Sequence, residues 1–150
     1  EPVSGAIIRI AHEAGSFGFR GQVYVMPKLF ITLASLSGML AVILGAFGAH
    51  ALRARLDEYS QGIWETAVQY HFYHALALLA VGIVALGQPH STLLRSSGWL
   101  FLLGTLVFSG SLYLLALSGT RWLGAVTPIG GLAFIGGWAC LAVASWKLIG

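Results

Sequence analysis

Four long apolar runs, separated by short polar connections, constrain this chain of 150 residues more than any other feature. Each run is about 20 residues long, and a helix of that length spans a bilayer hydrocarbon core of about 30 Å. Only 9% of the residues are charged, whereas about a quarter are charged in a soluble domain. The sequence therefore predicts an all-α membrane protein, with transmembrane helices near residues 29–49, 66–87, 97–117 and 127–147.

The connections between the runs predict the topology. They are short and carry charged residues such as Arg53, Arg95 and Arg121. Helices joined by short connections lie antiparallel, so we expect an up-down four-helix bundle. At the fourth run, Thr127 followed by Pro128 predicts a helix start, with Thr127 as the N-cap and the proline in the first turn.

The first 25 residues differ from the rest of the chain. Four glycines interrupt them, and their apolar groups are too short to cross a bilayer. We expect residues 1–25 to be an extension that need not belong to the native protein, with at most a short interfacial helix over 6–14. Met26, followed by Pro27 and the first apolar run, predicts that the transmembrane domain covers residues 26–150.

Composition and motifs argue against two classes of function. The net charge is +3, but the eight basic residues are scattered singly and form no basic patch, so we expect no nucleic-acid partner. Ser109-Gly110-Ser111 lacks the Gly-x-Ser-x-Gly context of a hydrolase nucleophile, and no other catalytic constellation is present in the sequence. We therefore expect a protein that is not an enzyme.

Small residues predict how the helices pack. In lipid, close approach of backbones and buried polar contacts hold helices together, because lipid tails are as apolar as the side chains. The first run has a row of small residues at four-residue spacing, and the fourth run is rich in glycine. We expect the packing faces to be formed by Ser37, Ala41, Gly45, Ala49, Ala133 and Gly137.

Polar residues gather toward one end of the predicted bundle. The antiparallel order places the ends of the first and third helices beside the starts of the second and fourth. The candidate polar cluster at this end consists of His50, Glu65, Gln69, His71, His74, Tyr113 and Thr127. At about 100° per residue, His71 and His74 share one helix face, whereas Glu65, Gln69 and Tyr73 lie on another. Ionisable groups within a span are costly and usually mark a functional site.

Three interpretations of the histidines are open. Neutral imidazoles can form hydrogen bonds across helices and hold the bundle in register. Alternatively, His50, His71 and His74 can bind a metal such as zinc, or two of them can ligate a haem. Their spacing lacks the defined pattern of a His-Glu-x-x-His metal motif, so the sequence predicts no particular cofactor. A proton or solute pathway is the third interpretation.

The ends of the spans give two further predictions. Tryptophans near span ends are typical interfacial anchors, which applies to Trp64, Trp99, Trp122 and Trp146. Within the bundle, the basic residues are balanced between the two sides of the membrane. Only Arg9 and Arg20 favour the orientation in which both termini are cytoplasmic.

Four motifs occur in an order that resembles one family. They are Gly-Ala-Phe-Gly-Ala-His-Ala-Leu at 45–52, Tyr-His-Phe-Tyr-His-Ala-Leu-Ala-Leu-Leu at 70–79, Phe-Ser-Gly-Ser-Leu-Tyr-Leu-Leu at 108–115, and Thr-Pro-Ile-Gly-Gly at 127–131 followed by Gly137-Trp138. Over about residues 29–147 the chain resembles the small inner-membrane family that contains YgdD and YwdK, domain of unknown function 423, which is related to eukaryotic transmembrane protein 256. The resemblance implies a bacterial inner-membrane protein of four helices and brings no reaction with it.

These observations together favour a non-enzymatic protein of the bacterial inner membrane. We expect an accessory or assembly partner of a larger membrane complex, or a homo-oligomer, because the loops are short and the helices carry small-residue faces. The alternatives are a module that binds a metal or haem through intramembrane histidines, and a small transporter or proton pathway.

Overall fold

The computed structural model describes residues 25–149. Its elements are α2 (Val25–Phe47), a short π-helix η1 (Gly48–Leu52) that continues α2, α3 (Glu58–Gly87), α4 (Thr92–Ser118) and α5 (Leu123–Ile149). Four helices within this range are long and apolar enough to cross a membrane, which confirms the predicted all-α class and its four spans. The expectations for the N-terminal extension, including a short helix over 6–14, fall outside the described residues.

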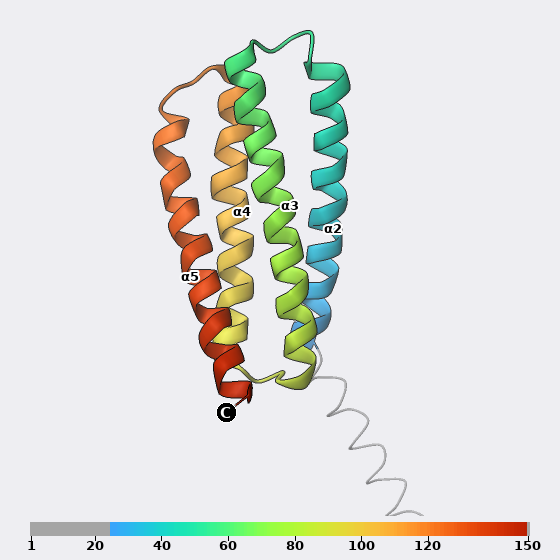
Figure 1. Cartoon of the computed structure of the whole chain (residues 1–150), viewed down its shortest axis with the longest axis vertical. Coiled ribbons are helices and arrows are strands. Elements are labelled where there is room, and N and C mark those ends of the chain that lie inside the picture. The colour runs from blue at the N-terminus through green and yellow to red at the C-terminus, as the bar shows by residue number, and fades with distance from the viewer. Residues whose placement is uncertain (1–24, 150) are drawn as a thin grey trace, which may run out of the picture.

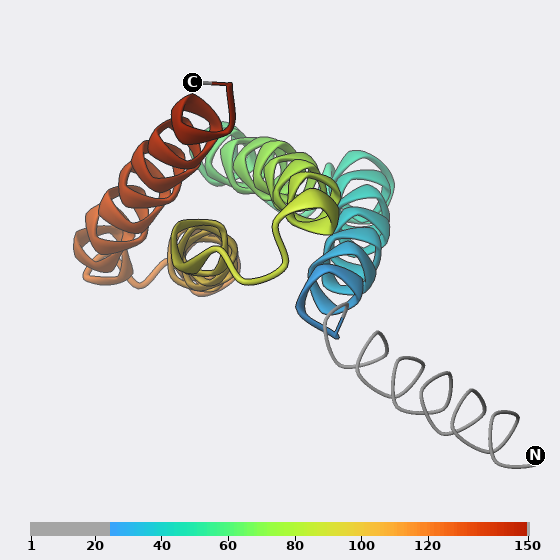
Figure 2. The ribbon, with the colours of Figure 1, turned by 90° about the horizontal axis from the view of Figure 1, so that it is seen from below.

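The helices are arranged as an open row. In Figure 1, α2 and α4 run in one direction along the long axis and α3 and α5 in the other. Each helix packs on the one before it, α3 on α2, α4 on α3 and α5 on α4. Seen along the long axis in Figure 2, α2 and α5 lie at opposite sides of the central pair α3 and α4. This arrangement makes α3 and α4 the best-buried helices.

The buried side of each helix follows alternating spacings of three and four residues. In α3 the buried series is Trp64, Ala67, His71, His74, Leu78, Val81 and Ala85. In α2 and η1 it is Pro27, Phe30, Ala34, Ala41 and Gly48, with half-buried Ser37 and Leu44 in the gaps. A seven-residue period keeps one stripe of each helix against its neighbour when helices wrap with a left-handed twist. The histidines therefore occupy packing positions.

This period corrects the small-residue row predicted for the first helix. A strict four-residue spacing advances about 400° per step, so the row drifts by about 40° each time and leaves the interface. Ala41 is buried and a Cβ atom on Gly45 would touch Val68 at 3.3 Å, but Ala49 is exposed. Gly48 is the buried residue at this level, because a side chain there would collide with the Trp64 indole.

Glycines of α4 and α5 receive aromatic rings from the opposite helix. Phe101 of α4 lies over Gly137, where a Cβ atom would come within 2.7 Å of the ring. Phe134 of α5 lies over Gly104 of α4 in the same way, whereas a Cβ atom on Gly130 would collide with the backbone of Phe108. Ala133, the second small residue predicted for this face, is only half-buried, and Gly130 is the buried glycine one turn before Phe134. These contacts bring the two backbones close enough for the Ser97 hydroxyl to donate to the Gly137 carbonyl at 2.8 Å.

Two helix starts lie earlier than the sequence predicts. The second span was expected near residue 66, but α3 begins at Glu58, because the Asp57 side chain caps it by accepting from the Ser60 amide at 2.7 Å. Thr127 is not an N-cap: α5 begins at Leu123 and Pro128 lies inside the helix. The prediction was wrong because the helical backbone begins before the apolar run does, and Thr127 faces α4 instead.

Candidate functional site

Two buried histidines stand three residues apart on α3. His71 is 5% exposed and His74 is 6% exposed. Three residues correspond to about 300°, so the two rings leave the helix about 60° apart and reach different neighbours. His71 contacts α2 and α4, whereas His74 contacts α4 and α5. The candidate site therefore has two halves with different surroundings.

His71 links three helices through a chain of hydrogen bonds. Its Nε2 lies 3.0 Å from Ser37 Oγ of α2, and its Nδ1 lies 3.3 Å from the Tyr113 hydroxyl of α4. Ser37 occupies a packing position of α2, which directs its hydroxyl toward α3. Tyr113 is near the end of α4, and helical side chains lean toward the N-terminus, so its hydroxyl reaches back into the bundle.

The His71 chain has one more proton than it has hydrogen bonds. A neutral imidazole carries one N–H, and each of the two hydroxyls carries one O–H, which makes three protons for two bonds. If Nε2 carries the proton, Tyr113 donates to Nδ1 and the Ser37 O–H is left over. If Nδ1 carries it, Ser37 donates to Nε2 and the Tyr113 O–H is left over. In both tautomers one end of the chain is a hydroxyl donor that His71 does not use.

The His71 chain borders a groove between α2 and α4, which we call the α2–α4 groove. Its volume is about 450 Å³, and it is lined mainly by leucines together with Ser37, His71, Thr105 and Tyr113. Nearer the start of α2, Phe30 covers Gly98 of α4 and packs edge-on against Trp99, with ring centroids 5.9 Å apart. The Thr105 hydroxyl donates to the Phe101 carbonyl at 2.9 Å, so the remaining polar atoms belong to the His71 chain.

His74 has both ring nitrogens in hydrogen bonds. Nδ1 lies 2.8 Å from the Tyr70 carbonyl, which can only accept, so Nδ1 carries the proton. Nε2 is then the acceptor, and the Trp138 indole N–H donates to it at 3.3 Å. The ring also stacks on Phe134, with centroids 3.4 Å apart and planes 9° from parallel. His74 therefore has no lone pair available for a metal or haem iron without breaking this arrangement.

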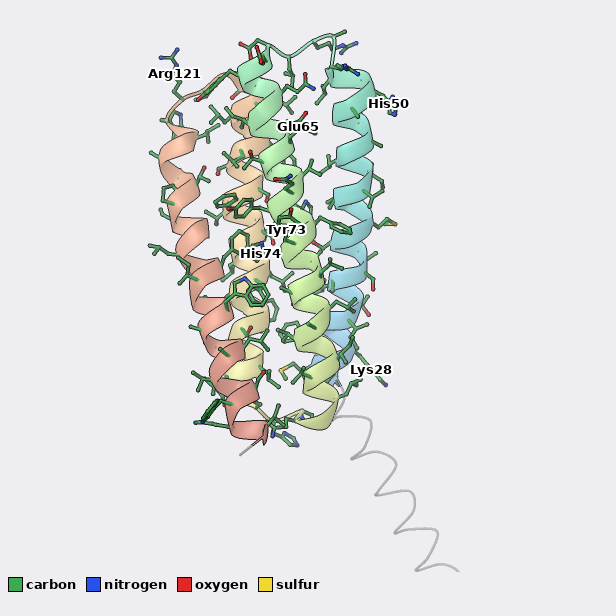
Figure 3. All side chains as sticks on the ribbon, in the orientation of Figure 1. Lys28, His50, Glu65, Tyr73, His74 and Arg121 are labelled. Carbon is green, nitrogen blue, oxygen red and sulfur yellow. The ribbon has the colours of Figure 1, made fainter. Side chains whose placement is uncertain are left out.

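The other residues of the predicted polar cluster lie in separate places. Thr127 forms a hydrogen bond of 2.8 Å with Ser111 between α5 and α4. Glu65 and Gln69 are exposed on the outer side of α3. His50 is exposed on η1, and Figure 3 shows it on the outer side of α2, away from His74. The seven candidates therefore do not form one cluster, because the helix faces that carry them point in different directions.

The proposed metal ligands are affected most by this separation. Among residues 25–149, no group of three or more His, Cys, Asp or Glu side chains is arranged to hold a metal ion. His50, His71 and His74 point to the outside of α2, to the α2–α4 groove and to α5, respectively. The structure thus offers no shared position at which the three imidazoles meet.

The roles of several residues in the site were not predicted from the sequence. Ser37 was assigned to helix packing alone, Trp138 was named only as part of a family motif, and Phe134 was not predicted. Trp64 was predicted as an interfacial anchor, which is wrong: it is 4% exposed and its indole N–H donates to the Leu44 carbonyl at 3.0 Å. The signal that could have placed Ser37, Trp64 and Phe134 is the alternating spacing of buried positions, because all three fall on it.

Comparisons with known proteins agree with this architecture. The profile of the family described as "Protein of unknown function (DUF423)" matches residues 44–131. "UPF0382 membrane protein SH2409" of Staphylococcus haemolyticus is 47% identical over 123 residues, which cover 82% of this chain and 99% of that protein. "UPF0382 membrane protein YwdK" of Bacillus subtilis is 46% identical over 123 residues, with 81% and 99% covered. No solved structure matches the chain. The chain therefore belongs to the DUF423 family of membrane proteins.

Proposed function

We propose that this protein is a non-enzymatic accessory protein of the bacterial inner membrane that works by binding a second, different membrane protein. The observation that carries the proposal is a polar row on the outer side of α3, formed by Gln61, Glu65, Gln69 and Tyr73. Glu65 and Gln69 are exposed, and Tyr73 is 55% exposed. Polar side chains on the outside of a transmembrane helix favour association with another helix over contact with lipid.

A groove that runs beside the polar row supports this proposal. Two hollows of about 330 and 280 Å³ lie along the line where α2 meets α3, and both are lined by Gly45, Val68 and Gln69. Together they form one groove. On one side α2 and η1 line it with small residues such as Ala41 and Ala49, and with Val42. Small residues beside hydrogen-bonding side chains are the combination that lets a transmembrane helix approach closely and pair.

The charge of Glu65 favours a different protein over a second copy of this chain. Two copies that insert with the same orientation and form a twofold dimer have their symmetry axis along the membrane normal. Two copies that pair through this groove would place their Glu65 side chains at the same depth, and like charges at one level repel. A partner helix with Arg or Lys at that depth would instead form an ion pair. The Glu65 carboxylate accepts a hydrogen bond from Gln61 Nε2 at 3.2 Å, which leaves oxygen lone pairs for such a partner.

Site-specific cross-linking tests this proposal. A photoreactive amino acid at Gln69, in cells that express the full chain, is expected to cross-link one membrane protein through a helix that carries Arg or Lys. Glu65→Lys should abolish the cross-link, and a Lys→Glu or Arg→Glu change in the partner should restore it. The same photoreactive residue at Leu132, which is 68% exposed on α5, is the matched control and should not capture that protein. Cross-links to a second copy alone, or a pattern unaffected by Glu65→Lys, would contradict the proposal.

We also propose that both termini lie in the cytoplasm. Arg9 and Arg20 precede α2 and would add to Lys28 on the side where α2 begins. Figure 3 shows Lys28 at one end of the bundle and Arg121 at the other. A reporter enzyme that is active only outside the cytoplasm, fused after residue 150, should be inactive. The same reporter inserted beside Arg121 should be active, and the reverse pattern would contradict this orientation.

A further inference from the structure

We propose that the α2–α4 groove binds a lipophilic carbonyl compound of the isoprenoid quinone type, and that the His71 chain supplies the hydrogen bond to its carbonyl oxygen. This site lies on a different side of α2 from the groove that we assign to a partner helix. The proposal therefore stands or falls separately from the proposed function. It rests on the number of protons in the His71 chain, on the depth of His71 in the membrane, and on the size and lining of the groove.

The leftover proton defines the polar part of the ligand. Ser37 and Tyr113 both line the α2–α4 groove, and one of their hydroxyls keeps a proton that His71 does not accept. A donor in an apolar groove favours a ligand with an acceptor oxygen, because an unpaired donor in such a place is unfavourable. Because the imidazole has two tautomers, the free donor can be the hydroxyl of Ser37 or that of Tyr113. The groove can thus bind a carbonyl at either of these two hydroxyls.

The depth of the His71 chain in the membrane indicates which class of carbonyl compound can reach it. His71 lies about 20 Å along α3 from Glu58, and Ser37 lies about 18 Å along α2 from Val25. Both positions are near the middle of a hydrocarbon core of about 30 Å. The ester carbonyls of phospholipids stay at the interface with the head groups, so they do not reach this level. A quinone ring has no charged head group and can lie within the core.

The shape and lining of the groove agree with such a ligand. A volume of about 450 Å³ falls within the range of small-molecule sites, about 300–1,000 Å³. The walls consist mostly of leucines, which suit an apolar ring and an isoprenoid tail. They are Leu33, Leu36, Leu40, Leu44, Leu102 and Leu106. Gly110 adds open space on the α4 side near Tyr113.

Photolabelling of the full chain in phospholipid nanodiscs tests the proposal. The probe is an azido derivative of decylubiquinone, and the labelled residues are mapped by mass spectrometry. We expect labels on groove residues such as Leu40, Leu102 and Leu106, which unlabelled decylubiquinone displaces. Decylbenzene, which has the tail and a ring but no carbonyl, should compete about tenfold less well, the effect of one lost hydrogen bond. This comparison uses the wild-type chain and does not depend on how a variant folds.

Variants of the chain complete the test. Ser37→Ala combined with Tyr113→Phe and His71→Leu removes every hydrogen-bond donor of the His71 chain, including the imidazole N–H that the first two changes would leave free. This variant should raise the decylubiquinone concentration for half-displacement about tenfold. Thr105→Val, in the same groove, is the matched control and should leave it unchanged, because the Thr105 hydroxyl already donates to Phe101.

Three results would overturn the proposal. The first is labelling spread over lipid-facing residues such as Leu132 without displacement. The second is competition by decylbenzene equal to that by decylubiquinone. The third is displacement by dioleoylglycerol at the same concentration as decylubiquinone, which would identify the occupant as a lipid ester.

Discussion

His71 and His74 lie about one helical turn apart on α3 and are equally buried. They differ in whether their hydrogen bonds leave a donor without an acceptor. Both nitrogens of His74 have a fixed partner, a carbonyl at 2.8 Å and an indole N–H at 3.3 Å, and the ring stacks on Phe134. His71 instead joins two hydroxyls, and the chain keeps one donor beside a groove. Burial alone therefore does not distinguish a structural histidine from one that can serve a ligand; the count of donors and acceptors does.

The largest effect is expected from removing the ring of His74. His74→Ala deletes the stack on Phe134 and leaves the Trp138 N–H and the Tyr70 carbonyl without this partner. We expect the free energy of unfolding in mixed detergent micelles to fall by about 3 kcal/mol. His74→Phe, which retains the stack, should cost about 1 kcal/mol. If His74→Ala costs no more than His74→Phe, the ring stack does not hold α3 against α5.

Smaller effects are expected at the ends of the His71 chain. Ser37→Ala and Tyr113→Phe each remove one hydrogen bond between helices, and such bonds contribute on average about 0.6 kcal/mol in membrane proteins. Each variant should therefore lower the free energy of unfolding by about 0.5–1 kcal/mol in the same assay. A loss for either variant as large as that of His74→Ala would show that the His71 chain is also structural, and the contrast between the two histidines would disappear.

The smallest effect is expected at the aqueous end of α3, and it should spare both histidines. The side-chain and backbone hydrogen bonds from Ser60 hold the pKa of the Asp57 carboxyl below its ordinary value. A carboxyl with a lowered pKa stabilises the fold above its unfolded pKa of about 3.9, and this contribution is lost as the pH falls through the lowered value. Below about pH 4, the protection factor of the Ser60 amide against hydrogen exchange should fall, while the protection factors of amides near His74 should not change.

Asp57→Asn is the matched variant for this pH dependence. Asparagine is also a good N-cap but does not titrate in this range. Exchange at Ser60 should then be independent of protonation at position 57. A Ser60 amide whose exchange keeps the same acid dependence in Asp57→Asn would show that another group controls the start of α3.

The sequence was sufficient to predict the four spans and to identify His71 and His74 as unusual. Apolar length decides which segments cross a membrane, and a histidine inside such a segment is visible without a structure. The helix starts at Glu58 and Leu123 could not be placed from apolar length, because the helices continue beyond the apolar runs. Asp57 followed by Ser60 was a readable capping signal for the first of them.

The separation of the polar residues could not be predicted, because it depends on which helices are neighbours. A shared end of the bundle says that residues lie at a similar depth, but not that they face one another. His50 lies on the π-helical turn η1 and is exposed, whereas the nearby Gly48 is buried. The 60° between His71 and His74 places them in different interfaces only because α2 and α5 lie on opposite sides of the central pair.

Nitrogen-15 NMR of the imidazole rings, in nanodiscs with and without decylubiquinone, tests the central claim most directly. His71→Gln and His74→Gln variants identify the signals of these two rings among those of the five histidines. We predict that His74 shows one tautomer, protonated at Nδ1, which decylubiquinone leaves unchanged. His71 should show exchange between tautomers without the quinone and a shift toward one of them when it is added. This prediction would be contradicted by a His71 signal that does not respond, or by a His74 signal that responds as strongly. Either result would mean that the spare hydrogen-bond donor does not distinguish His71 from His74.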